Sequence, residues 1–254
     1  MCGRYASFRS AQDLADAFDV EEITAAAAQV AAAYNVAPTD GIRMVVDRPP
    51  KPSANPAAKP DPQTGAPPPV RGMHLARWGL VPAWAKDLSI GARMINARSE
   101  TVDTKSAFAK PLRTKRCIVL ADGYYEWHTA ERPGGGKPVK TPYYVHPTDG
   151  SPIAFAGLYS WWRDPAKGDT DEDRWVLSAT IITQPARDGL EQIHEREPAV
   201  LDHDLITSWL DPDRTGAAEA LGVLAQPSPP LSWHEVGSAV GSVRNDGPEL
   251  IEPV

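Results

Sequence analysis

Cys2 follows the initiator methionine, and removal of Met1 would give the chain a free α-amine and a thiol on adjacent carbon atoms. Methionine is generally trimmed when the second residue is small. An α-amine titrates near pH 8, so roughly a tenth of it is unprotonated at pH 7, against well under about a thousandth of a lysine amine. The amine can attack a carbonyl, and the thiol can then close a thiazolidine ring on the imine because the capture is intramolecular. The alternative is that cysteine stands at position 2 by chance.

Glu126 lies in the run LADGYYEWH between two aromatic residues. Aromatic surroundings would desolvate its carboxylate and raise its pKa, which suits proton transfer near neutral pH. The alternative is a carboxylate on the outer face of a strand, exposed to water and without a chemical role. The segment therefore offers a candidate acid or base whose environment decides between the two interpretations.

Two further segments place polar groups at short spacing. In MINARSE, the side-chain amide of Asn96 can accept a hydrogen bond from an amine and donate one to a carbonyl, and Arg98 follows two residues later. In QIHEREPAVL, an extended chain would direct His194 and Arg196 to the same side, which joins a titratable ring to an anion binder. A single histidine is more often structural than catalytic, and spacing alone does not bring these residues together.

Basic residues concentrate in one segment of an acidic chain. The 254 residues carry 26 Lys and Arg against 33 Asp and Glu, a net charge of −7, whereas residues 71–117 contain ten basic and three acidic residues. This segment therefore has a charge of +7 and leaves −14 for the rest of the chain, and it also contains Trp78 and Trp84. Cations interleaved with aromatic rings suit a strand of unstacked nucleotides. The alternative is a solvated basic face with core tryptophans.

The composition indicates a globular protein that buries a core, with 42% hydrophobic and 23% charged residues. Cys2 and Cys117 are too few for a disulfide framework, and Cys117 lies in an apolar run that predicts a buried thiol. No apolar run reaches the roughly 18–20 residues of a membrane span, and the N-terminus lacks the apolar stretch of a secretory signal. We therefore expect a cytoplasmic protein with no membrane partner.

Short apolar runs predict the strands of an antiparallel or mixed sheet, over residues 42–46, 117–120, 143–145, 153–159 and 175–183. Helices are expected after Ser10, in an alanine-rich stretch over 21–33, after a cap at Asp202, and over 217–224. Loops are expected over 48–70, which holds nine prolines, and over 131–138 and 163–174. Because helices do not alternate regularly with strands, the sequence predicts an α+β fold on a curved sheet or open barrel.

Seven motifs occur in a fixed order between residue 2 and about residue 210. Together they closely resemble the SRAP family, the SOS-response-associated peptidases known for cross-linking abasic sites. The motifs are CGRY (2–5), YNVAPT (34–39), RWGLVPAWAKD (77–87), INAR-E (95–100), RCIVLADGYYEW (116–127), AGLYSWW (156–162) and IHEREP (193–198). Each is weak alone, and the combination is highly specific.

The resemblance implies one SRAP domain over residues 1–254, with a mixed or antiparallel barrel-like β core, several surrounding helices and the proline-rich insertion at about 48–70. It implies binding to single-stranded DNA and a covalent thiazolidine link from Cys2 to an abasic site, which shields the lesion from strand cleavage. The peptidase activity in the family name is best understood as autocatalytic removal of Met1, and a weak lyase activity is expected from the imine. We expect no metal, no organic cofactor, a monomer, and association with the nucleoid when bound to DNA.

The resemblance also assigns roles to individual residues. Cys2 matches the nucleophile, and Asn96 matches the residue that holds the Cys2 amine and the sugar. Glu126 matches the proton-transfer carboxylate, and His194 matches the imidazole near the ring-opened sugar. Six further residues match positions that line the DNA channel: Arg4, Asn35, Pro38, Trp84, Arg98 and Arg196.

Two residues depart from the family pattern. Glu197 follows Arg196 where a neutral or basic residue is expected in a DNA groove, so we expect it either to face away or to weaken binding locally. Ala85 follows Trp84 where some relatives carry a second aromatic ring, so one stacking platform is expected to be missing. Both departures bear on the affinity for DNA more than on the chemistry.

Two other functions compete with this interpretation. An N-terminal-nucleophile amidohydrolase also begins with Met-Cys-Gly and would use the Cys2 thiol on an amide, and release of ammonia from glutamine would identify it. A non-catalytic single-strand binder would leave Cys2 incidental, and replacing Cys2 by alanine would then change no DNA-dependent property.

Overall fold

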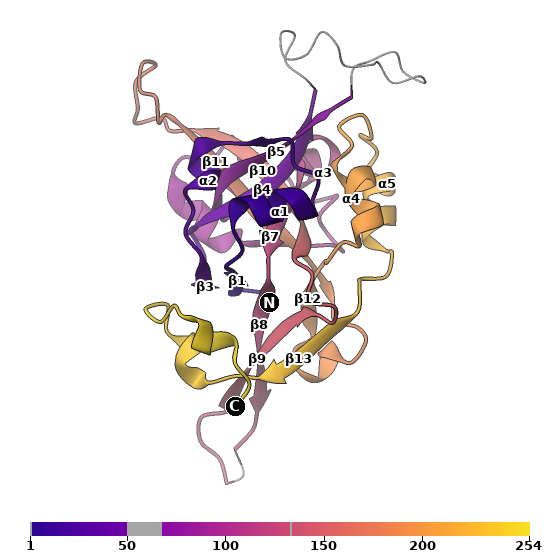
Figure 1. Cartoon of the computed structure of the whole chain (residues 1–254). Coiled ribbons are helices and arrows are strands. Elements are labelled where there is room, and N and C mark those ends of the chain that lie inside the picture. The colour runs from indigo at the N-terminus through magenta and orange to yellow at the C-terminus, as the bar shows by residue number, and fades with distance from the viewer. Residues whose placement is uncertain (1, 50–67, 133) are drawn as a thin grey trace.

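Five strands of the protein close into a barrel (Figure 1). The computed structural model describes residues 2–49, 68–132 and 134–254. The barrel order is β11-β10-β7-β4-β5, with antiparallel neighbours, and β5 returns to pair with β11 in parallel. These strands are β4 (Gly41–Arg48), β5 (Val70–Trp78), β7 (Arg116–Ala121), β10 (Ile153–Arg163) and β11 (Trp175–Pro185). The predicted α+β fold with a mixed, barrel-like β core is confirmed.

Three short strands extend the barrel. They are β2 (Glu22–Ile23), which joins β5, and β6 (Asn96–Arg98) and β12 (Arg196–Pro198), which both join β11. β11 is therefore paired with two strands that contain expected site residues: Asn96 and Arg98 in β6, and Arg196 in β12.

A second, antiparallel sheet lies below the barrel in Figure 1. Its order is β13-β9-β8-β1-β3. The strands are β1 (Tyr5–Ser7), β3 (Ala33–Val36), β8 (Gly123–Ala130), β9 (Val139–Pro147) and β13 (Leu231–Glu235). Asp122 joins β7 to β8, so the chain passes from the barrel into this sheet beside the N-terminal strand.

Successive side chains of a barrel strand point to opposite faces of the sheet, and the two faces contribute to two separate hydrophobic clusters. Ile118 and Leu120 of β7 pack into a cluster with residues of all five helices, while Cys117 and Val119 pack into a second cluster that contains Cys2. The helices are α1 (Ala11–Ala17), α2 (Ala25–Ala28), α3 (Ala109–Thr114), α4 (His203–Leu210) and α5 (Ala217–Leu224). Short 3₁₀ helices are η1 (Leu88–Arg93), η2 (Leu190–Gln192), η3 (Ser238–Gly241) and η4 (Pro248–Ile251). No helix among the described residues has both the length and the apolarity that crossing a bilayer requires.

Most of the predicted elements are present. α1 begins after Ser10, whose hydroxyl accepts a hydrogen bond from the backbone N–H of Asp13, and Asp202 caps α4 in the same way. The alanine-rich stretch over 21–33 is the exception, because only 25–28 is helical. Its flanks pair with β5 and β1, so strand pairing outweighs the helix propensity of alanine there. Of the proline-rich stretch at 48–70, residues 50–67 lie outside the described residues.

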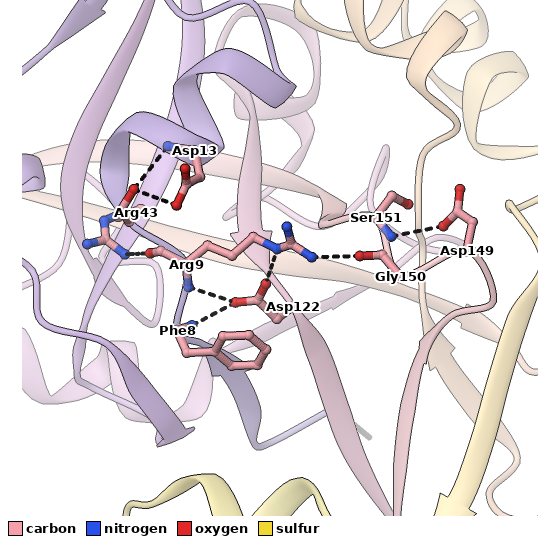
Figure 2. A network of polar contacts seen from close by, with 9 residues as sticks. Phe8, Arg9, Asp13, Arg43, Asp122, Asp149, Gly150 and Ser151 are labelled. Carbon is pink, nitrogen blue, oxygen red and sulfur yellow. Dashed lines mark hydrogen bonds and ion pairs between the residues drawn. The ribbon is translucent and has the colours of Figure 1, made fainter.

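A buried carboxylate fixes the chain just after β1 (Figure 2). Oδ2 of Asp122 accepts hydrogen bonds from the backbone N–H groups of Phe8 (2.6 Å) and Arg9 (3.2 Å), and Oδ1 accepts from Nε of Arg9 (2.6 Å). The Arg9 guanidinium also donates to the carbonyl of Gly150 (2.6 Å), and Arg43 donates to the carbonyl of Arg9 (3.3 Å). These contacts fix Phe8 and Arg9 at the end of β1, the strand whose other end leads to Cys2.

We expect Asp122→Ala to lower the free energy of unfolding by about 2–4 kcal/mol, because it leaves two backbone donors and a guanidinium without their buried acceptor. Urea denaturation at neutral pH measures this loss. Asp149→Ala is the matched control, since Asp149 also accepts from a backbone N–H, that of Ser151, but in solvent. The control should lose much less stability, and equal losses in the two variants would contradict the anchoring role of Asp122.

Candidate active site

Cys2 is buried among aromatic rings at the inner face of the barrel. Its cluster includes Tyr5, Trp78 and Phe155, and the ring of Tyr5 meets that of Trp78 edge to face with centroids 5.1 Å apart. Burial raises the pKa of the Cys2 thiol, and the nearby charge of Glu126 raises it further. The thiol is therefore protonated at neutral pH in the chain that retains Met1, where the nitrogen of Cys2 is part of a peptide bond.

Asn96 holds the backbone of Cys2. Its side-chain nitrogen donates a hydrogen bond to the Cys2 carbonyl (2.7 Å), and parallel pairing with Ile181 of β11 fixes its own backbone. The other end of the amide, Oδ1, is buried and has no hydrogen-bond partner among the described residues. The buried oxygen of the amide can still accept a hydrogen bond from a donor outside the described residues.

Glu126 lies on β8, the strand that runs beside the N-terminal segment. Tyr5 pairs with Tyr124, and the backbone N–H of Tyr125 donates to the carbonyl of Arg4 (3.0 Å), so Glu126 comes next to the residues that precede β1. Its side chain is only 4% exposed, so it is not an outward-facing carboxylate. Burial raises the pKa of Glu126 to about 7, which allows it to hold or release a proton near neutral pH.

His194 follows η2, and its neighbour Ile193 packs into the cluster that contains Cys2. The backbone N–H of Arg196 lies 3.0 Å from Nδ1 and can only donate, so the neutral ring carries its proton on Nε2. The ring thus turns back over its own chain, and His194 and Arg196 do not form the extended pair considered above. Burial, followed by the positive charge at the amino terminus, lowers the pKa of His194, so the imidazole is neutral at pH 7.

A segment near the C-terminus holds two of the residues expected to line a DNA channel. Arg4 donates to the side chain of Asn35 and to the carbonyl of Val240, both at 2.9 Å. The side-chain nitrogen of Asn35 donates to the carbonyls of Val240 (3.3 Å), Ser242 (2.9 Å) and Asn245 (2.8 Å). Sequence reasoning missed this segment because its contribution is backbone carbonyls, which every residue type supplies.

The other four expected channel residues differ in exposure. Arg98 is exposed, Trp84 is 60% exposed, and Pro38 is half-buried in the turn after β3. Arg196 is only 7% exposed, and it forms a bidentate ion pair with Glu100 and donates to the carbonyl of Thr183 (2.8 Å). The Arg196 guanidinium lowers the pKa of Glu100 to about 2, so this pair persists across the neutral range.

The structure accounts for both departures from the family pattern. Glu197 is buried and turns away from Arg196, because its carboxylate accepts hydrogen bonds from Gln184 (2.9 Å) and from the backbone N–H of Arg187 (3.3 Å). Ala85 is also buried, and its carbonyl accepts from the indole of Trp162 (2.8 Å). A larger side chain at position 85 would need room in the cluster that Trp162 fills, and Trp84 is left as the exposed ring of this loop.

Comparisons with known proteins agree on one family. The family model described as SOS response associated peptidase (SRAP) matches residues 1–243. The chain is 34% identical to the abasic site processing protein YoqW of Bacillus subtilis over 99% of both chains, and 31% identical to the abasic site processing protein YedK of Escherichia coli over 100% of both. A solved structure from Bacteroides thetaiotaomicron, 21% identical, superposes over the full length of both chains with a TM-score of 0.75, which establishes a shared fold.

Proposed function

Because the chain belongs to the SRAP family, we propose that it processes abasic sites in DNA by bonding Cys2 covalently to the lesion in single-stranded DNA. The adduct would shield the abasic site from strand cleavage. The observation that carries this proposal is the hydrogen bond from Asn96 to the backbone of the buried Cys2, together with a carboxyl of pKa about 7 on β8. Curated relatives along the whole chain are named abasic site processing proteins, which supports the same substrate class.

The first proposed step is removal of Met1 by the protein itself, which frees the α-amine of Cys2. Asn96 contacts Cys2 through Nδ2, and its Oδ1, which has no partner among the described residues, would accept a hydrogen bond from this amine and so orient the amine lone pair toward a carbonyl. Orientation matters because the amine must approach the aldehyde carbon rather than solvent. The hydrogen bond from Nδ2 to the Cys2 carbonyl holds the rest of the residue during this attack.

The second step joins the amine to C1′ of the ring-opened deoxyribose. Attack gives a carbinolamine, and its hydroxyl leaves as water when a proton is supplied, which yields an imine. Glu126, with its raised pKa, supplies this proton, and Nε2–H of His194 donates to the sugar oxygen. The Cys2 thiol then adds across the C=N bond: sulfur bonds to C1′, and the thiol proton passes to nitrogen. The adduct therefore contains all atoms of the Met1-trimmed protein and of the DNA except those of one water molecule.

Closure of the thiazolidine removes the imine from which β-elimination would cleave the strand. A weak lyase activity follows when elimination precedes closure. Single-stranded DNA fits the same site because the lesion must reach a buried cysteine, and an unpaired nucleotide turns out of the strand at lower cost than a paired one. Arg98 and Trp84, both exposed, offer a cation and a ring to the strand. The protein acts as a monomer in this scheme and uses no metal or organic cofactor.

The test is to incubate the purified protein with single-stranded DNA that carries one abasic site, and to analyse the products by denaturing gel and intact mass. Intact single strands and a duplex with the same lesion are the controls. We expect a heat-stable adduct on the abasic single strand, one water lighter than the sum of Met1-trimmed protein and DNA. Reversible binding alone, from protein shown to have lost Met1, would overturn the proposal in favour of a non-catalytic single-strand binder.

A further inference from the structure

A small cavity beside Trp84 is lined by two lysines to which no role has been given above. Its volume is about 110 Å³, and it lies between the loop that carries Trp84 and helix α3. Lys110 projects from α3 and Lys115 ends that helix, and the hydroxyl-bearing residues Ser106 and Ser160 complete its polar lining. Both lysines belong to the basic segment 71–117.

Lys110 and Lys115 line the same cavity, and the positive charge of Lys110 acts on Lys115. Neither lysine forms an ion pair with a carboxylate in the part of the chain that the structure describes. The pKa of Lys115 is lowered, first by partial burial and then by the positive charge of Lys110. An anion bound between them would remove this repulsion, so the pair favours a negatively charged ligand.

The indole beside the lysines has a fixed support. Trp84 is 60% exposed, and the next residue, Ala85, is buried against Val81 and Trp162. The carbonyl of Ala85 accepts a hydrogen bond from the Trp162 indole (2.8 Å), which ties the loop to β10. An exposed aromatic ring on a fixed loop is a platform for a nucleobase, because little conformational entropy is lost when the base stacks on it.

We propose that Trp84, Lys110 and Lys115 form a subsite for one nucleotide of the DNA strand other than the abasic one. The subsite holds the base of that nucleotide and the backbone phosphates next to it. This inference rests on the proposed function, since it places the same strand that reaches Cys2. The base stacks on the indole, and the phosphates lie between the ammonium groups, with the hydroxyl of the exposed Ser106 as a further donor. Recognition of this kind is independent of base identity, because every base has an aromatic face and every nucleotide has a phosphate.

The salt dependence of binding tests the subsite separately from the chemistry. The probe is a fluorescent single strand with one tetrahydrofuran residue, an abasic analogue that has no aldehyde and forms no adduct. Each lysine that neutralises a phosphate contributes about 0.7 to the slope of log K against log salt for a single strand. The variant with Lys110→Gln and Lys115→Gln should therefore lose about 1.4 from this slope. If wild type and variant bind equally at 1 M salt, that change makes binding about 25-fold weaker at 0.1 M.

The matched control replaces Lys137 and Lys140 by glutamine, which changes the net charge equally. Lys137 lies between β8 and β9 and Lys140 lies near the start of β9. Both are exposed on a hairpin that projects at the far end of the molecule from α3 (Figure 1). The control should keep the wild-type slope. Equal slope changes in the two double variants, or an unchanged slope in the Lys110 and Lys115 variant, would overturn the subsite. If that double variant does not fold, Lys110→Gln alone, at an exposed position, should lose about 0.7.

Adduct formation distinguishes failure of the subsite from failure of the proposed function. At saturating DNA with a true abasic site, the lysine variant should form the adduct at the wild-type rate, because neither lysine belongs to the group around Cys2. A wild-type protein that forms no adduct contradicts the proposed function, and the slopes measured with the analogue still decide whether the subsite exists. Adduct formation together with control-like slopes contradicts the subsite alone.

Discussion

Cys2→Ala is expected to reduce the heat-stable adduct with abasic single-stranded DNA to below detection while leaving reversible DNA binding close to wild type. The variant keeps an α-amine after removal of Met1, so it can still form an imine, but it has no thiol to close the ring. An imine hydrolyses, whereas the thiazolidine survives heating. Borohydride, which reduces an imine to a stable amine, should therefore restore a covalent product in this variant only when it is present during incubation.

Cys117→Ala is the matched control for this experiment. Cys117 is the second cysteine of the chain, and it is buried in the same hydrophobic cluster as Cys2. Its replacement removes a core thiol of the same size without touching the N-terminus, so the adduct should form as in wild type. An adduct of undiminished yield with Cys2→Ala, or its loss with Cys117→Ala, would assign the bond to a residue other than Cys2.

Glu126→Gln should slow adduct formation by about 10²–10⁴-fold, the usual contribution of a positioned acid or base. The wild-type rate should follow a bell-shaped pH profile. It rises as the α-amine, with a pKa near 8, loses its proton, and it falls as Glu126, with a pKa of about 7, becomes unable to supply one. The maximum is therefore expected at roughly pH 7.5, midway between the two pKa values. The glutamine variant should lose the alkaline decline, and a decline that persists would exclude Glu126 as the acid.

The same substitution should stabilise the fold at alkaline pH. The ordinary pKa of a glutamate is 4.5, and burial raises that of Glu126 to about 7, so between these values the folded chain keeps a proton that the unfolded chain releases. Wild-type stability therefore falls as pH rises through this window. Above pH 7 the difference amounts to about 3 kcal/mol at 1.36 kcal/mol per pH unit. Urea denaturation of the two proteins at pH 4 and pH 8.5 should show near-equal stability at the first and a more stable variant at the second.

Sequence patterns correctly predicted those helices and strands whose signals lie within a few neighbouring residues. The cap at Ser10, the cap at Asp202 and the apolar run that became β7 are all local signals, and each lies where it was expected. The alanine-rich stretch over 21–33 differs from its prediction because its flanks pair with β5 and β1, and pairing with distant strands is not a local signal. Local preference predicts an element reliably only where tertiary pairing agrees with it.

The parts of the site that the sequence did not predict are contacts between distant residues. Closure of the barrel pairs Arg77 with Ser178, and Arg196 binds the carboxylate of Glu100. Neither pair has a spacing that a local pattern can detect. The burial of Glu126 could be anticipated from its aromatic neighbours, but the register that places it beside the N-terminal segment is set by pairing across the sheet.

The grip of residues 240–245 on Asn35 and Arg4 links the site to the order of synthesis. A nascent chain exposes its N-terminal cysteine first, and it lacks the carbonyls that hold these two side chains until translation has passed residue 245 and that segment has left the ribosome. β13, which precedes the segment, pairs with β9 in the folded protein. The ordered Asn35 side chain therefore depends on carbonyls that lie 205 to 210 residues later in the chain, and a nascent chain does not hold Asn35 in this way until that segment has been made.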